Sequence, residues 1–313
     1  MKRATTSLPA TASGAVRRIF PALAADVALL LVFLYIALGS APSAGSPPAT
    51  APATAIEPLE GQPDSPQPAL AVGLPGLGSL KTAVESTLAT SDTRIGVIVR
   101  AGDGDVLLDI GSDERFVLAS VSKVYIMSAF LDMLWNEATE PDGLDLALLE
   151  DMIRYSDNDS ASTLWRRIGR EEGLDAFLSA KGLPPLDLTE DAGAWGTINA
   201  TPAEVSELLW RLVSGRLLDP ASTAVAVDLL SNIFEEQAWG VSAGASEPGA
   251  IVMLKNGWYP ESEGWRVNSA GAVEDSDGFY VVVIMAYPTP DLEAGISMLE
   301  GIAGRINVYM SSQ

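Results

Sequence analysis

The sequence predicts an α+β fold: a five-stranded antiparallel sheet flanked by helices, with an all-helical subdomain. Three observations lead to this class. Two strand-like segments open the globular part, a long helix-rich stretch follows at about residues 119–232, and three more strand-like segments and a helix close the chain. Strands that are grouped in this way, instead of alternating with helices, favour one antiparallel sheet with the terminal helices on one face.

The first 78 residues differ in composition from the rest of the chain. Residues 1–18 form a basic segment, which we place in the cytoplasm, and residues 19–39 contain the apolar run VALLLVFLYIALG. This order predicts a transmembrane signal anchor that leaves the remaining chain outside the cell membrane. A cleaved signal peptide is the alternative, and it would make the protein secreted. Residues 40–78, rich in Pro, Ala and Ser, predict a disordered linker.

The globular domain is expected over residues 79–313. The spacing in LKTAVESTLA predicts its first helix, and RIGVIVRA and VLLDIG, joined by GDGD, predict a β-hairpin. The segments AIVMLKN, WRVNSAGAV and FYVVVIMAY predict the three later strands. A final helix is expected over about residues 291–310.

Cysteine and histidine are both absent from the 313 residues. Zinc sites built on thiolate or imidazole cannot form, nor can a disulfide framework, and we expect no metal and no cofactor. A serine nucleophile would need lysine, a carboxylate or an amine as its base, because the usual histidine is missing. The formal net charge of −22 argues against a nucleic-acid partner.

The segment LASVSKVYIMSAF places Ser120 and Lys123 three residues apart in a helix that is apolar on nearly every side. Such a helix belongs in a core, where a lysine is rare without a partner and tends to lose its proton. Ser120 and Lys123 are therefore a candidate nucleophile and base. The alternative makes Ser120 a helix N-cap and lets Lys123 extend its amine to the surface.

Two further motifs follow in order. Ser156 and Asn158 stand in YSDNDSA between two helical segments, and Lys255, Asn256 and Gly257 stand in LKNGWY on a predicted strand. Taken alone, the first motif is typical of a loop with helix caps, and the second of a strand that ends in an Asn-Gly turn.

The order S-x-x-K, S-D-N, K-x-G resembles the class A β-lactamases and penicillin-binding proteins over roughly residues 79–313. The resemblance implies that Ser120 is the acylated nucleophile, Lys123 its base or proton relay and Ser156 a donor to the leaving nitrogen. It implies that Lys255 keeps the local potential positive. The substrate-binding groups would be Asn158, Asn256, Gly257 and the backbone N–H of Trp258, with Arg266 as a further candidate for the substrate carboxylate.

The sequence departs from that family at two points. Asn256 stands where the family has Ser or Thr, and the segment KGLPPLDLTEDAGAWGTINATPAE contains no Glu-x-x-Asn to activate a deacylating water. We therefore expect a serine hydrolase that acts on β-lactams or peptidoglycan stem peptides of the D-Ala-D-Ala type and deacylates slowly. The alternative is a non-catalytic envelope protein that binds peptidoglycan or a partner.

Overall fold

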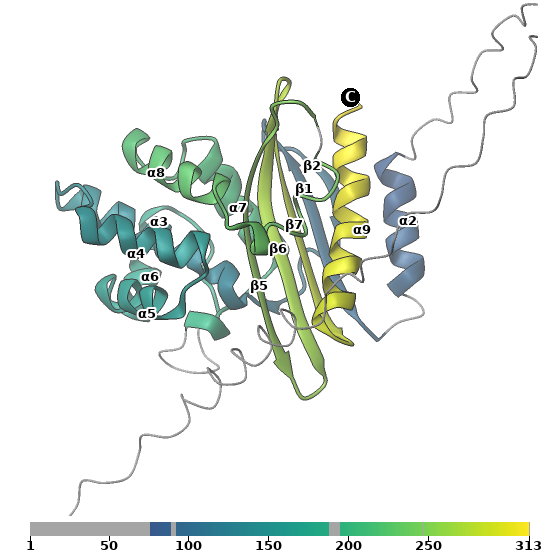
Figure 1. The fold of residues 1–313 in the computed structure, drawn as a ribbon, viewed down its shortest axis with the longest axis horizontal. Coiled ribbons are helices and arrows are strands. Elements are labelled where there is room, and N and C mark those ends of the chain that lie inside the picture. The colour runs from purple at the N-terminus through teal and green to yellow at the C-terminus, as the bar shows by residue number, and fades with distance from the viewer. Residues whose placement is uncertain (1–75, 89–91, 188–194, 246, 313) are drawn as a thin grey trace, which may run out of the picture. The chain divides into compact units, whose positions relative to one another are not determined.

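The computed structural model describes residues 76–88, 92–187, 195–245 and 247–312 (Figure 1). The first described element is helix α2 (Leu77–Leu88), which begins two residues before the expected start of the domain. The expected basic segment, the anchor at 19–39 and nearly all of the linker lie outside the described residues. Within the described ranges, no helix is long and apolar enough to cross a membrane.

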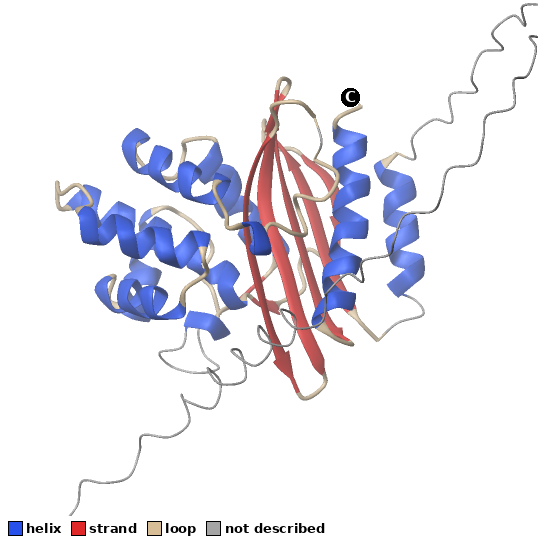
Figure 2. Cartoon of the chain, in the orientation of Figure 1, coloured by secondary structure: helices blue, strands red, loops and turns tan. Residues whose placement is uncertain are grey.

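The predicted antiparallel sheet flanked by helices is confirmed (Figure 2). It has five strands in the order β2-β1-β7-β6-β5. A small second sheet of β3 and β4 brings residues 199–200 beside the segment that precedes Ser120. The strands are β1 (Arg94–Ala101), β2 (Val106–Ile110), β3 (Phe116–Val117), β4 (Asn199–Ala200), β5 (Ile251–Glu261), β6 (Gly264–Asp275) and β7 (Gly278–Thr289).

Helices cover both faces of the sheet. Helix α9 (Leu292–Met310) and α2 lie on one face, and the all-helical subdomain lies against the other (Figure 1). The helices on the second side are α3 (Ser122–Asn136), α4 (Gly143–Arg154), α5 (Asn158–Arg167), α6 (Arg170–Ala180), α7 (Pro202–Val213) and α8 (Pro220–Ser231). Three single turns of 3-10 helix complete the set, namely η1 (Ala119–Val121), η2 (Trp195–Thr197) and η3 (Glu235–Gln237).

Strand alternation divides the core into two layers. On β7, Val283 packs toward the helical subdomain, whereas Val282 and Ile284 pack toward α9. Helix α3 runs through the larger layer and is buried on nearly every side, as its largely apolar sequence predicts.

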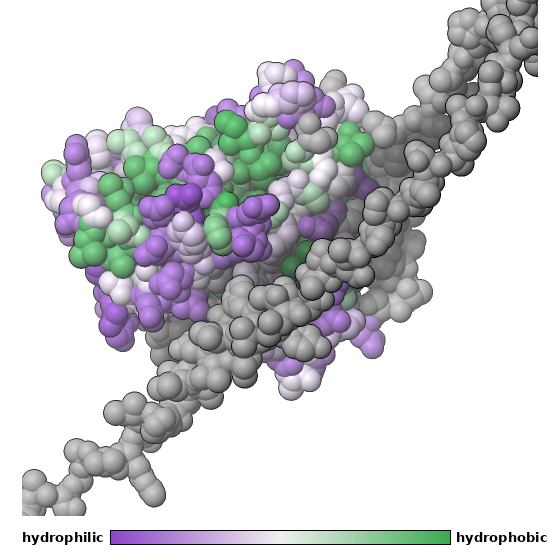
Figure 3. Space-filling model, viewed as in Figure 1, coloured by the Kyte–Doolittle hydropathy of each residue, from purple (hydrophilic) through white to green (hydrophobic). Residues whose placement is uncertain are grey.

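The outer surface of the helical subdomain mixes polar and apolar residues (Figure 3). Helix α4 exposes Leu144 and Leu146 on it, at 66% and 43% of their surface. Single exposed leucines of this kind are common on the surface of soluble domains. The side chains around α3, in contrast, are buried in the core.

We expect Phe130→Ala in α3 to lower the free energy of unfolding by about 3–5 kcal/mol, because the ring is fully buried and leaves a cavity. Leu144→Ala, at an exposed position on α4, is the control and is expected to change it by about 0.5 kcal/mol or less. Urea unfolding of both variants measures the difference, and similar losses would contradict the assignment of α3 to the core.

Candidate active site

Ser120 lies in the turn η1, which leads directly into α3. The preceding residue, Ala119, has φ +50°, a left-handed conformation that L residues adopt only when their surroundings hold it. Helix α3 is N-capped by Val121 without a side-chain hydrogen bond, so the alternative that made Ser120 a side-chain cap is wrong. The turn leaves Ser120 half-buried, beside the start of the most buried helix.

Two residues of the sheet hold this turn in place. The buried amide of Asn268 on β6 donates to the carbonyl oxygens of Val117 (2.9 Å) and Leu118 (3.2 Å). Gly257 on β5 lies so close that an added Cβ would stand 2.6 Å from the Leu118 carbonyl oxygen and 2.8 Å from the Ser120 backbone nitrogen. Glycine is therefore required at 257 for close approach, and β5 continues to Glu261 instead of ending in the Asn-Gly turn considered from the sequence.

Lys123 is fully buried, so the alternative in which its amine reaches the surface is also wrong. Its Nζ donates to the backbone oxygen of Ser156 at 2.5 Å, and lies 3.1 Å from Ser156 Oγ and 2.9 Å from Asn158 Oδ1. The ring of Trp195 covers the amine, with its centre 4.8 Å from Nζ. No sequence motif indicated that Trp195 lies beside this amine.

Ser156 stands between the two lysines of the motifs. Its φ of +58° turns the chain sharply between α4 and α5, and Asp157 then caps α5 by accepting from the backbone N–H of Ser160 at 2.7 Å. Lys255 Nζ lies 2.9 Å from Ser156 Oγ, which Lys123 Nζ also contacts at 3.1 Å. One hydroxyl thus contacts two buried amines, and the loop capping considered from the sequence is present as well.

Burial makes both amines weak bases. Desolvation, together with the charge of Lys255, lowers the pKa of Lys123 to about 6, and the nearby Asp157 only partly opposes this. Desolvation lowers the pKa of Lys255 to about 7. A neutral Lys123 can donate two hydrogen bonds and accept one from Ser156, which matches its three oxygen contacts.

Asn256 points to the other face of β5, away from Lys255 and Gly257. Its Nδ2 donates to the carbonyl oxygens of Gln237 (2.7 Å) and Trp239 (3.0 Å), so both amide hydrogens are used. Trp258 shares this face and packs edge-on against Trp239. The structure therefore leaves Asn256 with no amide hydrogen to donate to a substrate.

We call residues 234–239 the strap, because they connect β5 to the turn that carries Ser156. The Phe234 N–H donates to the Arg154 carbonyl oxygen at 3.1 Å, and Gln237 Nε2 donates to the Tyr155 carbonyl oxygen at 2.6 Å. Since Asn256 holds the other side of the strap, its amide positions the Ser156 turn from a distance.

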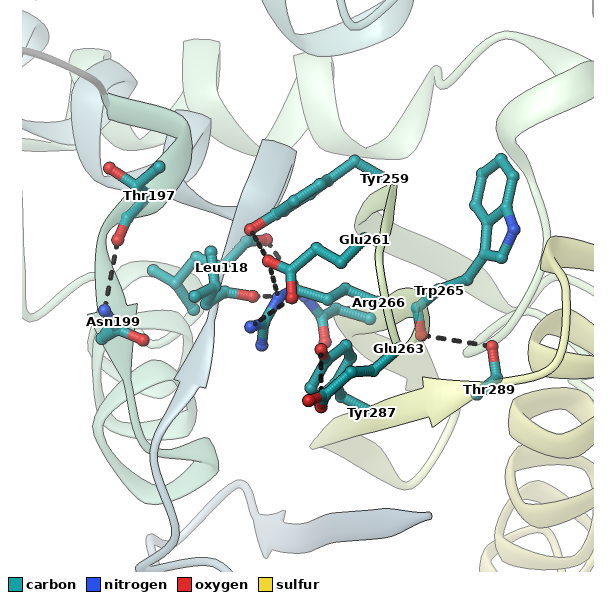
Figure 4. Close-up of polar contacts among 12 residues, drawn as sticks. Leu118, Thr197, Asn199, Tyr259, Glu261, Glu263, Trp265, Arg266, Tyr287 and Thr289 are labelled. Atoms are coloured by element: carbon teal, nitrogen blue, oxygen red, sulfur yellow. Dashed lines mark hydrogen bonds and ion pairs between the residues drawn. The ribbon is translucent and has the colours of Figure 1, made fainter. Parts of the chain in front are cut away.

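Arg266 on β6 is paired within the chain (Figure 4). Its Nε and Nη2 donate to the two carboxylate oxygens of Glu261 at 2.7 and 2.8 Å, and Tyr259 also donates to Glu261. These bonds lower the pKa of Glu261 to about 2, against the opposing effect of its partial burial. The suggested carboxylate-binding arginine is thus already bound to a carboxylate.

The structure brings Lys123, Ser156, Asn158 and Lys255 into direct contact, and it places Gly257 against the turn that carries Ser120. Among the described residues, Ser120 Oγ makes no hydrogen bond with the Lys123 amine. The catalytic roles of these side chains stay predictions. Glu190 and Asp191, in the segment where the family carries its deacylating glutamate, lie outside the described residues.

The three motifs lie on a helix, a turn and an edge strand. Together with the sheet topology, these positions identify a member of the β-lactamase-like serine hydrolase superfamily. The chain belongs to the β-lactamase enzyme family, whose model matches residues 138–310, more than half of its length. The match includes Ser156 and Lys255 and begins after Ser120 and Lys123. No curated protein matches the sequence.

Solved structures share the fold at low sequence identity. The extended-spectrum β-lactamase TLA-3 has a TM-score of 0.66 and 17% identity, over 75% of this chain and 99% of the other. PBP-A has a TM-score of 0.65 and 20% identity, over 77% and 100%. A class A β-lactamase from Bacteroides cellulosilyticus has a TM-score of 0.65 and 19% identity, over 75% and 98%.

The chain contains only five lysines, so their titration can be followed individually by NMR of the Cε carbons. We expect two resonances with a pKa near 6 and near 7, which disappear in Lys123→Met and Lys255→Met respectively. The absence of any lysine resonance with a pKa near 6 or near 7 would contradict the desolvated pair.

Proposed function

We propose that this protein is a membrane-tethered, extracytoplasmic serine hydrolase that forms an acyl-enzyme through Ser120. Its acyl donors are β-lactams or peptides of the D-Ala-D-Ala type. The observation that carries the proposal is the Ser156 hydroxyl, which lies between two buried lysine amines beside the Ser120 turn. A structural domain has no use for two desolvated amines, since burying them opposes folding.

In the proposed reaction, Ser120 Oγ attacks the carbonyl carbon and transfers its proton to the neutral amine of Lys123. The new C–O bond forms as the amide C–N bond breaks. Ser156 passes a proton to the leaving nitrogen and is resupplied by the lysines on either side. Bond formation and proton transfer then balance, and the product is an ester of Ser120.

Backbone and amide groups are available to hold the substrate. Gly257 lets β5 approach the Ser120 backbone nitrogen, which supports the N–H groups of Ser120 and Trp258 as an oxyanion hole. Asn158 is exposed, and while its Oδ1 faces Lys123, its Nδ2 makes no hydrogen bond with the described residues. That amide can donate to the acylamide carbonyl of a substrate.

Slow deacylation is part of the proposal. Hydrolysis of the ester needs a base to activate water, and the chain has no histidine. The side chain over the Lys123 amine is Trp195, whose ring offers no basic atom. A PBP-A variant with 20% identity and a TM-score of 0.64 is known as an acyl-enzyme complex with penicillin G.

We propose that residues 19–39 tether the domain outside the cell membrane.

We expect penicillin G to add its full mass to the wild-type protein and Ser120→Ala to remove the adduct completely. Ser231→Ala on α8, which removes a hydroxyl that bonds only the Val227 carbonyl oxygen among the described residues, is the control and keeps the adduct. Intact-mass spectrometry after removal of free penicillin also records how slowly the adduct decays.

The same experiment tests the non-catalytic alternative, which the absence of a bond between Ser120 Oγ and Lys123 favours. No adduct with any β-lactam or activated ester, together with stem-peptide binding that survives Ser120→Ala, would support a binding protein instead.

The rate of acylation is expected to follow a bell-shaped pH profile. It rises as Lys123 loses its proton, near the lowered pKa of about 6, because only the neutral amine can accept a proton. It falls as Lys255 loses its charge, near a pKa of about 7, because the positive potential is then lost. Lys255→Ala is expected to remove the falling limb, and a rate that rises steadily up to pH 10 would contradict these roles.

A further inference from the structure

The cationic groups around Ser120 are few. Lys123 on α3, Lys255 on β5 and Arg266 on β6 are the cationic residues of η1, the first turn of α3, β5 and β6. Arg115, which precedes β3, is paired with Glu204 at 3.1 Å. The chain as a whole carries a net charge of −22, which repels anionic ligands at long range.

Arg266 lies on the same face of the sheet as the Ser120 turn. It pairs across the strands with Tyr259, and the next pair on this face is Asn268 with Gly257, which contact that turn directly. Residues two apart along a strand are about 6.7 Å apart, so the Arg266–Tyr259 pair lies next to the Asn268–Gly257 pair that contacts the Ser120 turn.

Glu261 occupies the hydrogen-bonding fork of this arginine. Figure 4 shows Tyr259, Glu261 and Arg266 converging, with Arg266 also stacked on Tyr287, whose ring centre is 3.9 Å from Cζ. The Arg266 side chain is 14% exposed and the Glu261 side chain 27% exposed. A bidentate pair of this kind neutralises Arg266. It also occupies the two hydrogen-bond donors with which a guanidinium recognises a ligand carboxylate.

The other hydrogen-bond donors of the site already have partners within the chain. Asn256 uses both amide hydrogens on the strap, and the two lysine amines are buried around Ser156. Among the described residues at the site, no positive group is left free for a substrate carboxylate.

We infer that Glu261 is a specificity-determining residue: by holding Arg266 it makes the site accept acyl donors with an uncharged group beside the scissile bond at least as well as donors with a carboxylate there. The inference rests on the proposed function and names its substrate class. The substrates it favours are esters and amides at that position.

The test compares the acylation rates of penicillin G and its methyl ester, which differ only in that carboxylate, by intact-mass spectrometry. In the wild type, the acid-to-ester rate ratio is expected to be about one or lower. Glu261→Gln frees the Arg266 charge and is expected to raise the ratio about tenfold, the worth of one charge-assisted hydrogen bond.

Glu263→Gln is the matched control, because it removes the same charge from the same hairpin. Glu263 contacts only the Tyr287 hydroxyl among the described residues, at 3.4 Å, so the ratio is expected to stay within about twofold of the wild type. Adding Arg266→Ala to Glu261→Gln is expected to cancel the gain.

Two results would overturn the inference and leave acylation intact: a wild-type ratio above about ten, or equal ratios for Glu261→Gln and Glu263→Gln. If neither probe acylates the wild type, the proposed function fails, and the inference fails with it.

Discussion

The arrangement of two lysine amines around one serine hydroxyl is the constraint on which the rest of the site depends. Lys123 and Lys255 are at most 1% exposed, and neither has an ion pair among the described residues. Water stabilises a charged amine far better than a protein interior does, so burial without a carboxylate favours the neutral form. Burial thereby lowers the pKa of both amines that contact the Ser156 hydroxyl.

Holding these groups together takes contacts from both layers of the domain. Asn268 and Gly257 fix the Ser120 turn on the sheet, while the strap joins β5 to the turn that carries Ser156. Asn256 belongs to this scaffold. Its replacement of the family's hydroxyl residue is explained by packing, because an amide can bond two carbonyl oxygens of the strap and a hydroxyl has one hydrogen to donate.

The same site is poor in free positive charge. Glu261 neutralises Arg266, and Glu261 is itself held by Tyr259, so the pair forms a closed set of hydrogen bonds. The Arg266–Tyr259 pair and the Asn268–Gly257 pair therefore lie next to each other on one face of the sheet, and only the second pair contacts the Ser120 turn.

The sequence by itself determined the α+β class, the grouped strands, the largely buried α3 and the three motifs, because hydrophobic periodicity and short motifs are local. The absence of histidine also predicted Lys123 as the candidate base. Only the tertiary structure decided that β5 runs through Asn256–Gly257, that Trp195 covers Lys123, and that Glu261 pairs with Arg266. These features depend on contacts between residues that are distant in sequence or on opposite sides of a turn. Strand alternation predicts the face on which a side chain lies, but not the residue that it contacts there.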